Sequence, residues 1–163
     1  MDRLSREQPE DWWDVEALYD LCFAPGREAL SSYRLRDGVE PVRELCLVLH
    51  DEFGAVAGAI RYWPVRIGAA EALLLGPVAV HPIRQGEGLA ARLIEESLTI
   101  ATRLGWERVM LVGDAPYYGR FGFERLDDVE MPPPTNPERV LGRALVPGAW
   151  DGIAGKVERA QRE

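Results

Sequence analysis

Hydrophobic and polar positions follow two different periods along this chain, and the changes from one to the other mark its expected elements. Apolar and β-branched residues dominate five short runs, which predict strands. The runs are 45–49, 56–65, 72–80, 108–112 and 140–146. Between 88 and 104 the apolar side chains instead recur every three or four residues, which predicts an amphipathic helix that ends before Gly105.

The order of these elements predicts how two pairs of strands are joined. Residues 72–80, 88–104 and 108–112 form a strand, a crossover helix and a strand, which is the pattern of a parallel pair. The turn-like residues 50–54 lie between the runs 45–49 and 56–65, so we expect these two runs to form an antiparallel hairpin. The apolar stripe of the helix consists of Leu89, Leu93, Ile94, Leu98, Ala101 and Leu104.

The first part of the chain carries a weaker pattern. Residues 3–7 predict a short first strand, and a helix is expected to begin at Pro9, because proline is well suited to the first helical position. The apolar face of this helix is expected to hold Trp12, Val15, Leu18, Tyr19 and Cys22. The residues Ala24-Pro25-Gly26 end that pattern, and a second short helix is expected over 30–35.

One strand is interrupted in a way that bears on function. The run 72–80 is nearly all apolar, which predicts burial on both faces, but Gly76-Pro77 breaks it. Proline has no N–H to give a neighbouring strand, so we expect a β-bulge at this point. A bulged strand bends away from its partner and leaves backbone groups unpaired, which makes them available to a ligand.

The residues after this strand predict an anion site. Gln85-Gly86-Glu87-Gly88 leads into the helix, and glycine permits positive φ and a close approach of the backbone to a ligand. The first turn of a helix presents unpaired N–H groups and the positive end of its dipole. A nucleoside-triphosphate P-loop is excluded, because Leu89 and Ala90 stand where Lys and Ser/Thr are needed. The dinucleotide fingerprint is excluded, because its three glycines and later acidic residue are missing.

Length and charge narrow the class of protein. The chain has 163 residues, of which 47% are hydrophobic, enough for a single domain over 1–163 with its core at about 2–150. Residues 131–137 predict a proline-rich loop, and the charged residues 156–163 a frayed or surface tail. The net charge of −8 disfavours nucleic-acid binding and suits a cationic substrate.

Signals for export, membrane insertion and metal binding are missing from the sequence. The N-terminus lacks a basic start and apolar run, and no stretch is long enough for a membrane helix, so we expect a cytoplasmic protein. Cys22 and Cys46 lie in apolar runs without C-x-x-C spacing and are expected to be reduced core residues. His50 and His81 are too isolated for a zinc site, so no metal is expected.

Two motifs give the chain a resemblance to a known family. Gln85-Gly86-Glu87-Gly88-Leu89-Ala90, after an apolar strand, resembles the Q/R-x-x-G-x-G/A motif of the Gcn5-related N-acetyltransferases (GNAT). The segment 113–123, GDAPYYGRFGF, resembles the Y-x-x-x-G-F element of that family and, more narrowly, a bacterial subgroup of predicted acetyltransferases. A weaker likeness runs from the N-terminal helix to 145–152, so the resemblance covers most of the chain.

The resemblance implies a fold and an activity. The fold is that of acyl-CoA N-acyltransferases, an α/β (α+β) domain whose mixed central sheet of about six to seven strands is flanked by helices and has a bulged, splayed fourth strand. The activity is transfer of an acetyl group from acetyl-CoA to a primary amine of a small molecule or peptide by direct attack, without an acyl-enzyme. Part of the acceptor site is commonly formed by the region of the first two helices. Dimers are common in the family, so the resemblance also allows a homodimer.

The same resemblance assigns residues to the site. The pyrophosphate of the coenzyme is expected on backbone N–H groups of the glycine turn, and the pantetheine arm along the edge of the fourth strand. The cofactor-binding residues are then Val78, Ala79, Val80, Gln85, Gly86, Glu87, Gly88, Leu89 and Ala90. Tyr118, four residues before Gly122, stands where the family places its proton donor to the departing thiolate, with Tyr117 as the alternative.

The general base and the phosphate-screening residues stay open at this level. Asp114 is the first candidate for the base, although an aspartate before Ala-Pro often caps a turn. Further candidates are Asp51, Glu52 and His81. Arg84 and Arg120 either screen phosphates or are paired surface residues. The alternative function is a non-catalytic acyl-CoA-binding sensor or regulatory module, which would keep the glycine turn without the chemistry.

Overall fold

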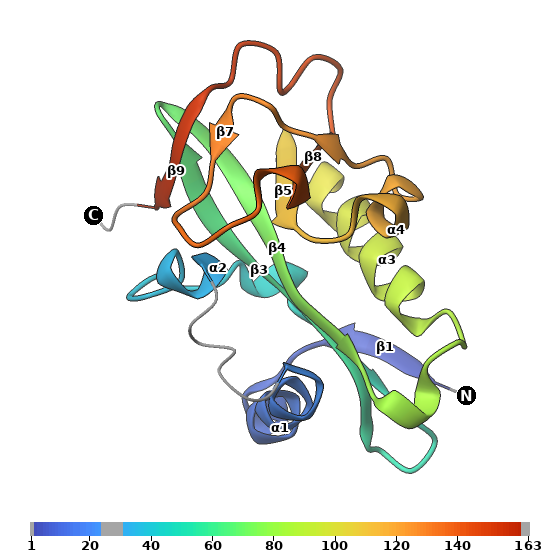
Figure 1. Cartoon of the computed structure of the whole chain (residues 1–163). Coiled ribbons are helices and arrows are strands. Elements are labelled where there is room, and N and C mark those ends of the chain that lie inside the picture. Colours follow the sequence, from blue (N-terminus) through green and yellow to red (C-terminus); the bar gives the residue numbers. More distant parts are fainter. Residues whose placement is uncertain (1, 24–30, 161–163) are drawn as a thin grey trace.

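One mixed β-sheet forms the centre of the molecule (Figure 1), seen in a computed structural model that describes residues 2–23 and 31–160. Within those residues the sheet has nine strands, seven of them in the order β1-β2-β3-β4-β5-β8-β6, while β9 pairs with β3 and β7. The strands are β1 (Arg3–Arg6), β2 (Leu47–His50), β3 (Val56–Ile67), β4 (Ala70–Val80), β5 (Arg108–Val112), β6 (Glu124–Arg125), β7 (Val129–Glu130), β8 (Val140–Ala144) and β9 (Gly155–Arg159). The mixed α/β class is confirmed, with more strands than expected.

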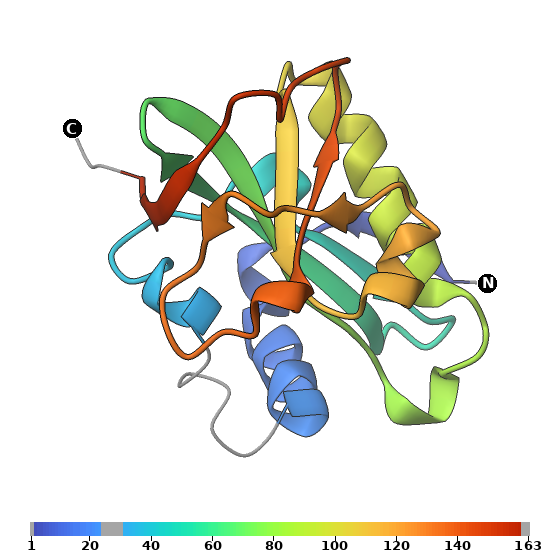
Figure 2. The same ribbon diagram turned by 45° about the horizontal axis from the view of Figure 1, so that its top comes forward.

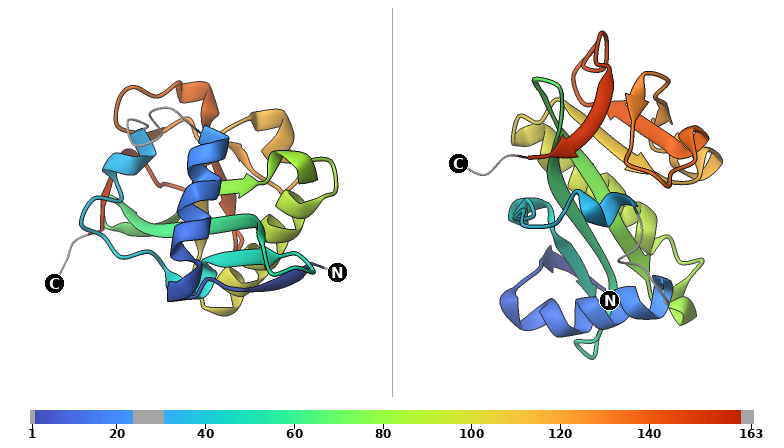
Figure 3. Two further views of the ribbon diagram at one scale, coloured as in Figure 1. Left: turned by 90° about the horizontal axis from the view of Figure 1, so that it is seen from below. Right: turned by 60° about the vertical axis from the view of Figure 1, so that its left-hand side comes forward.

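Helices cover both faces of the sheet. They are α1 (Trp12–Phe23), α2 (Ser31–Arg34), α3 (Leu89–Arg103) and α4 (Ala115–Gly119), with 3₁₀ turns at Pro9–Asp11, Arg43–Leu45, Pro82–Arg84 and Pro137–Arg139. α1 packs on Val48 and Ala59, whereas α3 packs on Leu47 and Ile60. Successive residues of a strand point to opposite faces, so the two helices lie on opposite sides of the sheet. Figure 3 looks from one side onto α1, which crosses the strands.

The two strand connections expected from the sequence are confirmed. β2 and β3 form an antiparallel hairpin in which Leu47 lies opposite Ile60. β4 and β5 are parallel, with α3 as the crossover between them, and β5 has the bounds that the sequence predicted. The stripe of α3 is buried from Leu89 to Ala101, because its side chains fill the space over β2, β3 and β4.

Several expectations at the ends of elements are wrong. The expected tail over 156–163 is wrong for residues 156–159, which belong to β9: Val157 is buried and pairs with Ile67 of β3, and a single inward apolar residue between charged neighbours gave no strand signal. Residues 161–163 lie outside the described residues. Trp12 is 44% exposed, because α1 only begins there and its buried face starts at Val15. Leu104 is 50% exposed, because it caps α3 beyond the last covered turn.

The remaining boundary differences are small. β2 begins at Leu47 because Arg43–Leu45 forms a 3₁₀ turn. The second helix is confirmed as Ser31–Arg34, while Ala24-Pro25-Gly26 and Leu30 lie outside the described residues. The proline-rich segment is irregular until its last residue, Pro137, where a 3₁₀ turn starts.

Candidate active site

β4 and β5 pair over a short stretch and then separate, which opens the sheet (Figure 2). The register joins Leu73 to Val109 and Leu74 to Met110. Beyond these pairs β4 continues along β3 as far as Val80, while β5 continues along β8 as far as Val112. One edge of β4 after Leu74 is therefore not covered by β5, and the expected splay of this strand is confirmed.

The predicted β-bulge lies where β4 begins to leave β5. The register of β3 with β4 jumps from Ile60 opposite Val78 to Tyr62 opposite Leu75. Arg61 alone therefore faces the two residues Gly76 and Pro77, which is the geometry of a bulge. The bulge bends the strand at the point where the sequence places its proline.

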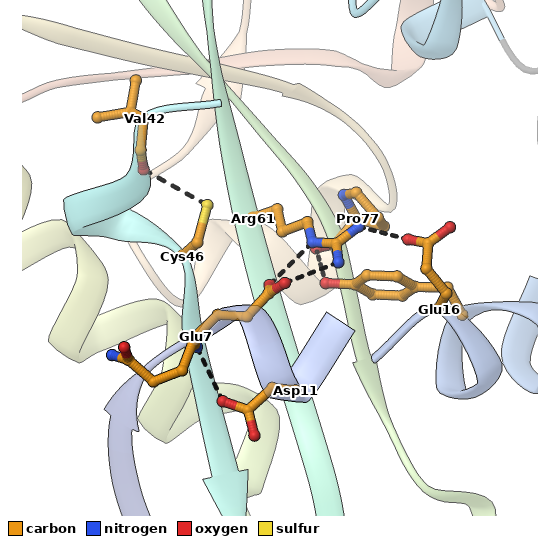
Figure 4. Close-up of polar contacts among 9 residues, drawn as sticks. Glu7, Asp11, Glu16, Val42, Cys46, Arg61 and Pro77 are labelled. Atoms are coloured by element: carbon orange, nitrogen blue, oxygen red, sulfur yellow. Dashed lines mark hydrogen bonds and ion pairs between the residues drawn. The ribbon is translucent and has the colours of Figure 1, made fainter. Parts of the chain in front are cut away.

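Polar contacts from the α1 side hold the bulge (Figure 4). The Tyr19 hydroxyl donates to the Pro77 carbonyl at 3.1 Å. The Arg61 guanidinium donates to both carboxylate oxygens of Glu7 at 2.9 Å and also to Glu16. The Arg61 side chain is only 7% exposed, so both carboxylates are needed to compensate its buried charge. The bent edge of β4 thus rests on a paired and buried network.

The main chain of the open edge points in two directions. The His81 N–H donates to the Ala57 carbonyl, and in an antiparallel pair the bonded positions alternate. Ala79 therefore turns its N–H and C=O toward β3, whereas Val78 and Val80 turn theirs toward the open side. The Val80 carbonyl accepts a weak bond from the Cys22 thiol at 3.5 Å. The edge offers main-chain groups of Val78 and Val80 to an extended ligand.

The glycine turn is built as the sequence predicted. Gly86 and Gly88 have φ of +88° and +78°, and a Cβ on either would meet no atom within 4 Å. The empty space above both glycines fits a ligand that lies directly on the backbone. The Arg92 N–H donates to the Gly88 carbonyl, which is the first hydrogen bond of the α3 helix. The N–H groups before Arg92 in the first turn therefore have no carbonyl acceptor within the helix. These amides and the helix dipole favour an anion here.

The other residues of the turn have defined positions. Leu89 is buried in the core and Ala90 is half-buried in the first turn of α3. The Gln85 N–H donates to the Pro82 carbonyl at 3.4 Å. Arg84 is held by two 2.8 Å bonds to Glu87 and one of 2.7 Å to Asp2, and its hydrogen bonds to Glu87 lower the pKa of the Glu87 carboxyl. Arg84 is thus an ion-paired residue, which leaves the backbone as the main anion-binding group.

The two tyrosines of the downstream motif face two different cavities. Tyr118 lines a cavity of about 290 Å³ between the separated strands, together with Gly76, Pro77 and Val78. Tyr117 lines a cavity of about 330 Å³ beside the glycine turn, where Arg120 lies 5.2 Å from its ring centre. Both rings also pack on the main core. The geometry therefore separates the pair that the sequence left ambiguous.

Burial makes Tyr118 a weak acid. Loss of solvation is the main cause that raises the pKa of its hydroxyl to about 12, with smaller increases from Tyr117 and Asp114 that Arg139 opposes. The phenol therefore carries its proton at neutral pH. A thiol has an ordinary pKa near 8.5, about 3.5 units lower, so the departing thiolate is a weaker base than the Tyr118 phenolate. Tyr118 can therefore give its proton to the sulfur only in a transfer in which its own oxygen is reprotonated.

Asp114 caps α4. Its Oδ2 accepts a 2.9 Å bond from the Tyr117 N–H, which is the usual function of an aspartate at a helix N-cap. The side chain also lies on the rim of the Tyr118 cavity. The other candidates for a base lie outside that cavity: the Asp51 carboxylate holds the Phe53 and Ala55 amides, Glu52 is exposed, and the His81 ring accepts from Ile83.

Several residues of the cavity were not expected from the sequence. Phe23, Tyr33 and Arg36 line the cavity from α1 and the α2 region, and Arg139 lines it near Tyr118 of α4. An isolated arginine after a four-residue helix has no periodicity, so only the folded arrangement identifies it. Cys22 and Cys46 are free thiols. Across residues 2–23 and 31–160, no three metal-ligating side chains gather and no helix is long and apolar enough to span a membrane.

Gly113 gives a test of how Tyr118 is positioned. A Cβ on Gly113 would lie 2.6 Å from the Tyr118 ring, whereas one on Gly119 would meet nothing within 4 Å. Gly113→Ala is therefore expected to displace the ring and lower the free energy of unfolding by about 1–3 kcal/mol, measured in urea. Gly119→Ala is the matched control and should leave stability within about 0.5 kcal/mol of the original. Equal effects of the two changes would contradict the packing described for Tyr118.

Comparison with known proteins agrees with this arrangement. Residues 42–125 match the family model described as an acetyltransferase (GNAT) domain. The chain is 31% identical to the N-acetyltransferase YhbS of Escherichia coli K12 over 156 residues, which cover 93% of this chain and 92% of the relative.

Two solved structures of similar proteins contain bound coenzyme. A crystal structure of Escherichia coli YhbS in complex with CoA has a TM-score of 0.84 at 30% identity and covers 98% of this chain and 89% of its own. A GNAT family acetyltransferase from Brucella melitensis in complex with acetyl-CoA has a TM-score of 0.71 at 29% identity, with 98% and 96% covered. A split sheet, a glycine turn at the start of α3 and these similarities lead to one assignment: the chain belongs to the GNAT family of acetyltransferases.

Proposed function

We propose that this protein transfers an acetyl group from acetyl-CoA to a primary amine by direct attack, without an acyl-enzyme. The observation that carries the proposal is the junction of three features at one place. The open edge of β4, the glycine turn and the Tyr118 cavity all lie along the gap between β4 and β5. Two similar proteins were solved with CoA or acetyl-CoA bound, which supports the same donor here.

The coenzyme would lie along this gap in an extended form. Main-chain groups of Val78 and Val80 would pair with the pantetheine amides as an added strand does. Ala79 would lie between them in the binding edge, with its own N–H and C=O directed toward β3. The backbone between Gln85 and Ala90 would hold the pyrophosphate, with Gly86, Glu87, Gly88 and Leu89 supplying N–H groups. No metal is required, because the amides and the helix dipole supply the positive end.

The chemistry would take place at the Tyr118 end of the cavity. The neutral amine attacks the thioester carbonyl carbon, and a backbone N–H near Val78 stabilises the negative oxygen that forms. The carbon–sulfur bond then breaks, and the sulfur takes the proton of the Tyr118 hydroxyl. The proton lost by the amine goes to Asp114 directly or through water and is then released to solvent, while the Tyr118 oxygen takes a proton from solvent.

Two variants of Asp114 separate its proposed role as general base from its role as N-cap of α4. Asp114→Asn keeps a capping oxygen for the Tyr117 amide but removes the carboxylate, whereas Asp114→Ala removes both. If the carboxylate is the base, both variants lower kcat by about 10²-fold or more. If Asp114 only caps, Asn keeps full turnover and Ala loses about 1 kcal/mol of stability, measured in urea.

Thiol release tests the proposed function. The protein is incubated with acetyl-CoA and a panel of amino acids, diamines, aminoglycosides and peptides, and free coenzyme A thiol is measured with a chromogenic disulfide. Release that depends on a particular amine, with the acetylated amine identified by mass, is the expected result. Tight binding of acetyl-CoA with no transfer to any amine would instead favour a sensor or regulatory module, and absence of binding would overturn the site as a whole.

A further inference from the structure

The cavity between the separated strands contains an arginine that lacks a carboxylate partner within the described residues. The Arg36 guanidinium lies 3.8 Å from the ring centre of Tyr33 and 4.4 Å from that of Trp63. Its Nε is fully buried and has no hydrogen-bond partner. In residues 2–23 and 31–160, no ion pair joins Arg36 to Asp or Glu. A buried donor without an acceptor is costly, so its persistence needs a reason.

The neighbouring Arg61 shows how this chain compensates a buried arginine when no ligand is involved. Arg61 is held by Glu7 and Glu16, each within hydrogen-bond distance. Carboxylates are not scarce, since the chain has 27 acidic against 19 basic residues. Burial lowers the pKa of Arg36; burial acts on Arg61 in the same direction, but the hydrogen bonds that Arg61 donates to the two glutamates outweigh it and raise its pKa. The two arginines differ in that only Arg36 lines the cavity of Tyr118.

Charges divide the cavity into two ends. Tyr118 experiences the charges of Arg139 and Asp114, which places these groups at the α4 end. Arg36 lies near the Arg61 guanidinium and the neutral phenol of Tyr19, at the end formed by α1 and β3. The transferred acetyl group belongs at the Tyr118 end if Tyr118 acts on the sulfur. Arg36 is then at the far end, where the part of the acceptor that does not react would lie.

We propose that Arg36 binds a carboxylate of the acceptor, so that the acceptor is a small molecule with both an amine and a carboxylate, of the amino-acid type. The inference rests on the proposed acetyl transfer and specifies its acceptor. The guanidinium is already stacked on two rings and keeps a free Nε–H, which is the donor that carboxylates use in paired bonds. A cavity of about 290 Å³ is at the lower limit for ligand sites, so it suits a small acceptor. The negative net charge of the chain favoured a cationic acceptor, but the positive Arg36 guanidinium in the cavity favours an acceptor that also carries a negative group.

Matched acceptors test this inference directly. Each of the twenty amino acids and the common diamino acids is compared with its carboxamide and with the amine that lacks the carboxylate, and kcat/KM is measured by thiol release. We expect the carboxylate form of the best acceptor to exceed both analogues by about 10- to 100-fold. Equal rates for an acid and its amide would overturn the inference while leaving acetyl transfer intact. Failure of acetyl-CoA to bind would instead overturn the proposed function.

Variants of Arg36 provide the second test. Arg36→Gln keeps much of the stem but removes the charge, and is expected to raise KM for the acid about 10- to 100-fold while leaving the amide unaffected. Arg36→Lys should restore part of the loss, because it keeps the charge without the planar fork. Arg103→Gln makes the same change on the exposed end of α3 and is the control. A loss of acid and amide activity in equal measure would show a structural role only.

A readout independent of turnover uses the buried donor itself. The Nε–H signal of Arg36 is assigned in a nitrogen–proton correlation spectrum by its absence from Arg36→Gln, with coenzyme A present. Glutarate and the amino acids are then titrated against sodium chloride of equal ionic strength. A saturable downfield shift with a carboxylate and none with chloride is expected, since the Nε–H gains an acceptor. No saturable shift across the panel would overturn the inference.

Discussion

Replacing Gly86 by valine is expected to lower the affinity for acetyl-CoA by about 100-fold or more, measured by calorimetry. Gly86 has a φ of +88°, a conformation that costs a β-branched residue about 1–2 kcal/mol, so the turn would change its path. The added side chain would also fill the empty space in which the pyrophosphate is proposed to lie. Gly88→Val should act in the same way at the start of α3.

Gly68 provides the matched control for this experiment. It has a φ of +61° and open space above it, but it lies in the turn between β3 and β4, at the opposite end of β4 from the site. Gly68→Val should therefore cause a similar loss of stability in urea and leave the affinity for acetyl-CoA unchanged. Unchanged affinity in Gly86→Val, or an equal loss in Gly68→Val, would contradict the proposed pyrophosphate site.

The second large effect is expected for Tyr118→Phe, which should lower kcat by about 10²- to 10⁴-fold without weakening acetyl-CoA binding. The substitution removes the proton donor but keeps the ring, which fills the space beside Gly113. Because the thiolate must then leave without a proton, only the chemical step is slowed. Stopped-flow measurement of thiol release in a single turnover isolates that step from product release.

Tyr117→Phe is the control, and the pH profile adds a check. Tyr117 faces the other cavity, so its loss should leave kcat within about twofold of the original. The raised pKa of Tyr118, about 12, keeps the hydroxyl protonated, so this group should not reduce activity until the pH approaches that value. Full turnover in Tyr118→Phe, or a loss of activity that follows Tyr117 instead, would assign the proton to another group.

The local parts of the site could be predicted because their chemistry is local. Gly86 and Gly88 indicate a backbone conformation that other residues avoid, and Pro77 indicates a break in strand pairing. Both features follow from the covalent structure of single residues, whatever packs around them. The order of strand, turn and helix then brings the bulge and the turn to the same edge of the sheet.

Other parts could not be predicted, because they depend on residues far apart in the sequence. The sequence placed Tyr117 and Tyr118 side by side, and only the orientation of α4 directs one to each cavity. Val157 became a core residue because β3 extends beyond β2 and leaves an edge for β9. Trp12 was assigned to the buried stripe, but α1 meets the sheet one turn later.

The sequence by itself determined the class of fold, the bend in β4 and the glycine turn at the start of α3, since these rest on the dihedral and hydrogen-bonding limits of glycine and proline and on the period of the apolar residues. The tertiary structure alone decided which tyrosine faces the gap, that Asp114 caps α4, and that the buried Arg36 Nε has no hydrogen-bond partner among the residues that the structure describes. The physical reason is that burial and charge pairing depend on distances between segments, which local preferences along the chain do not contain.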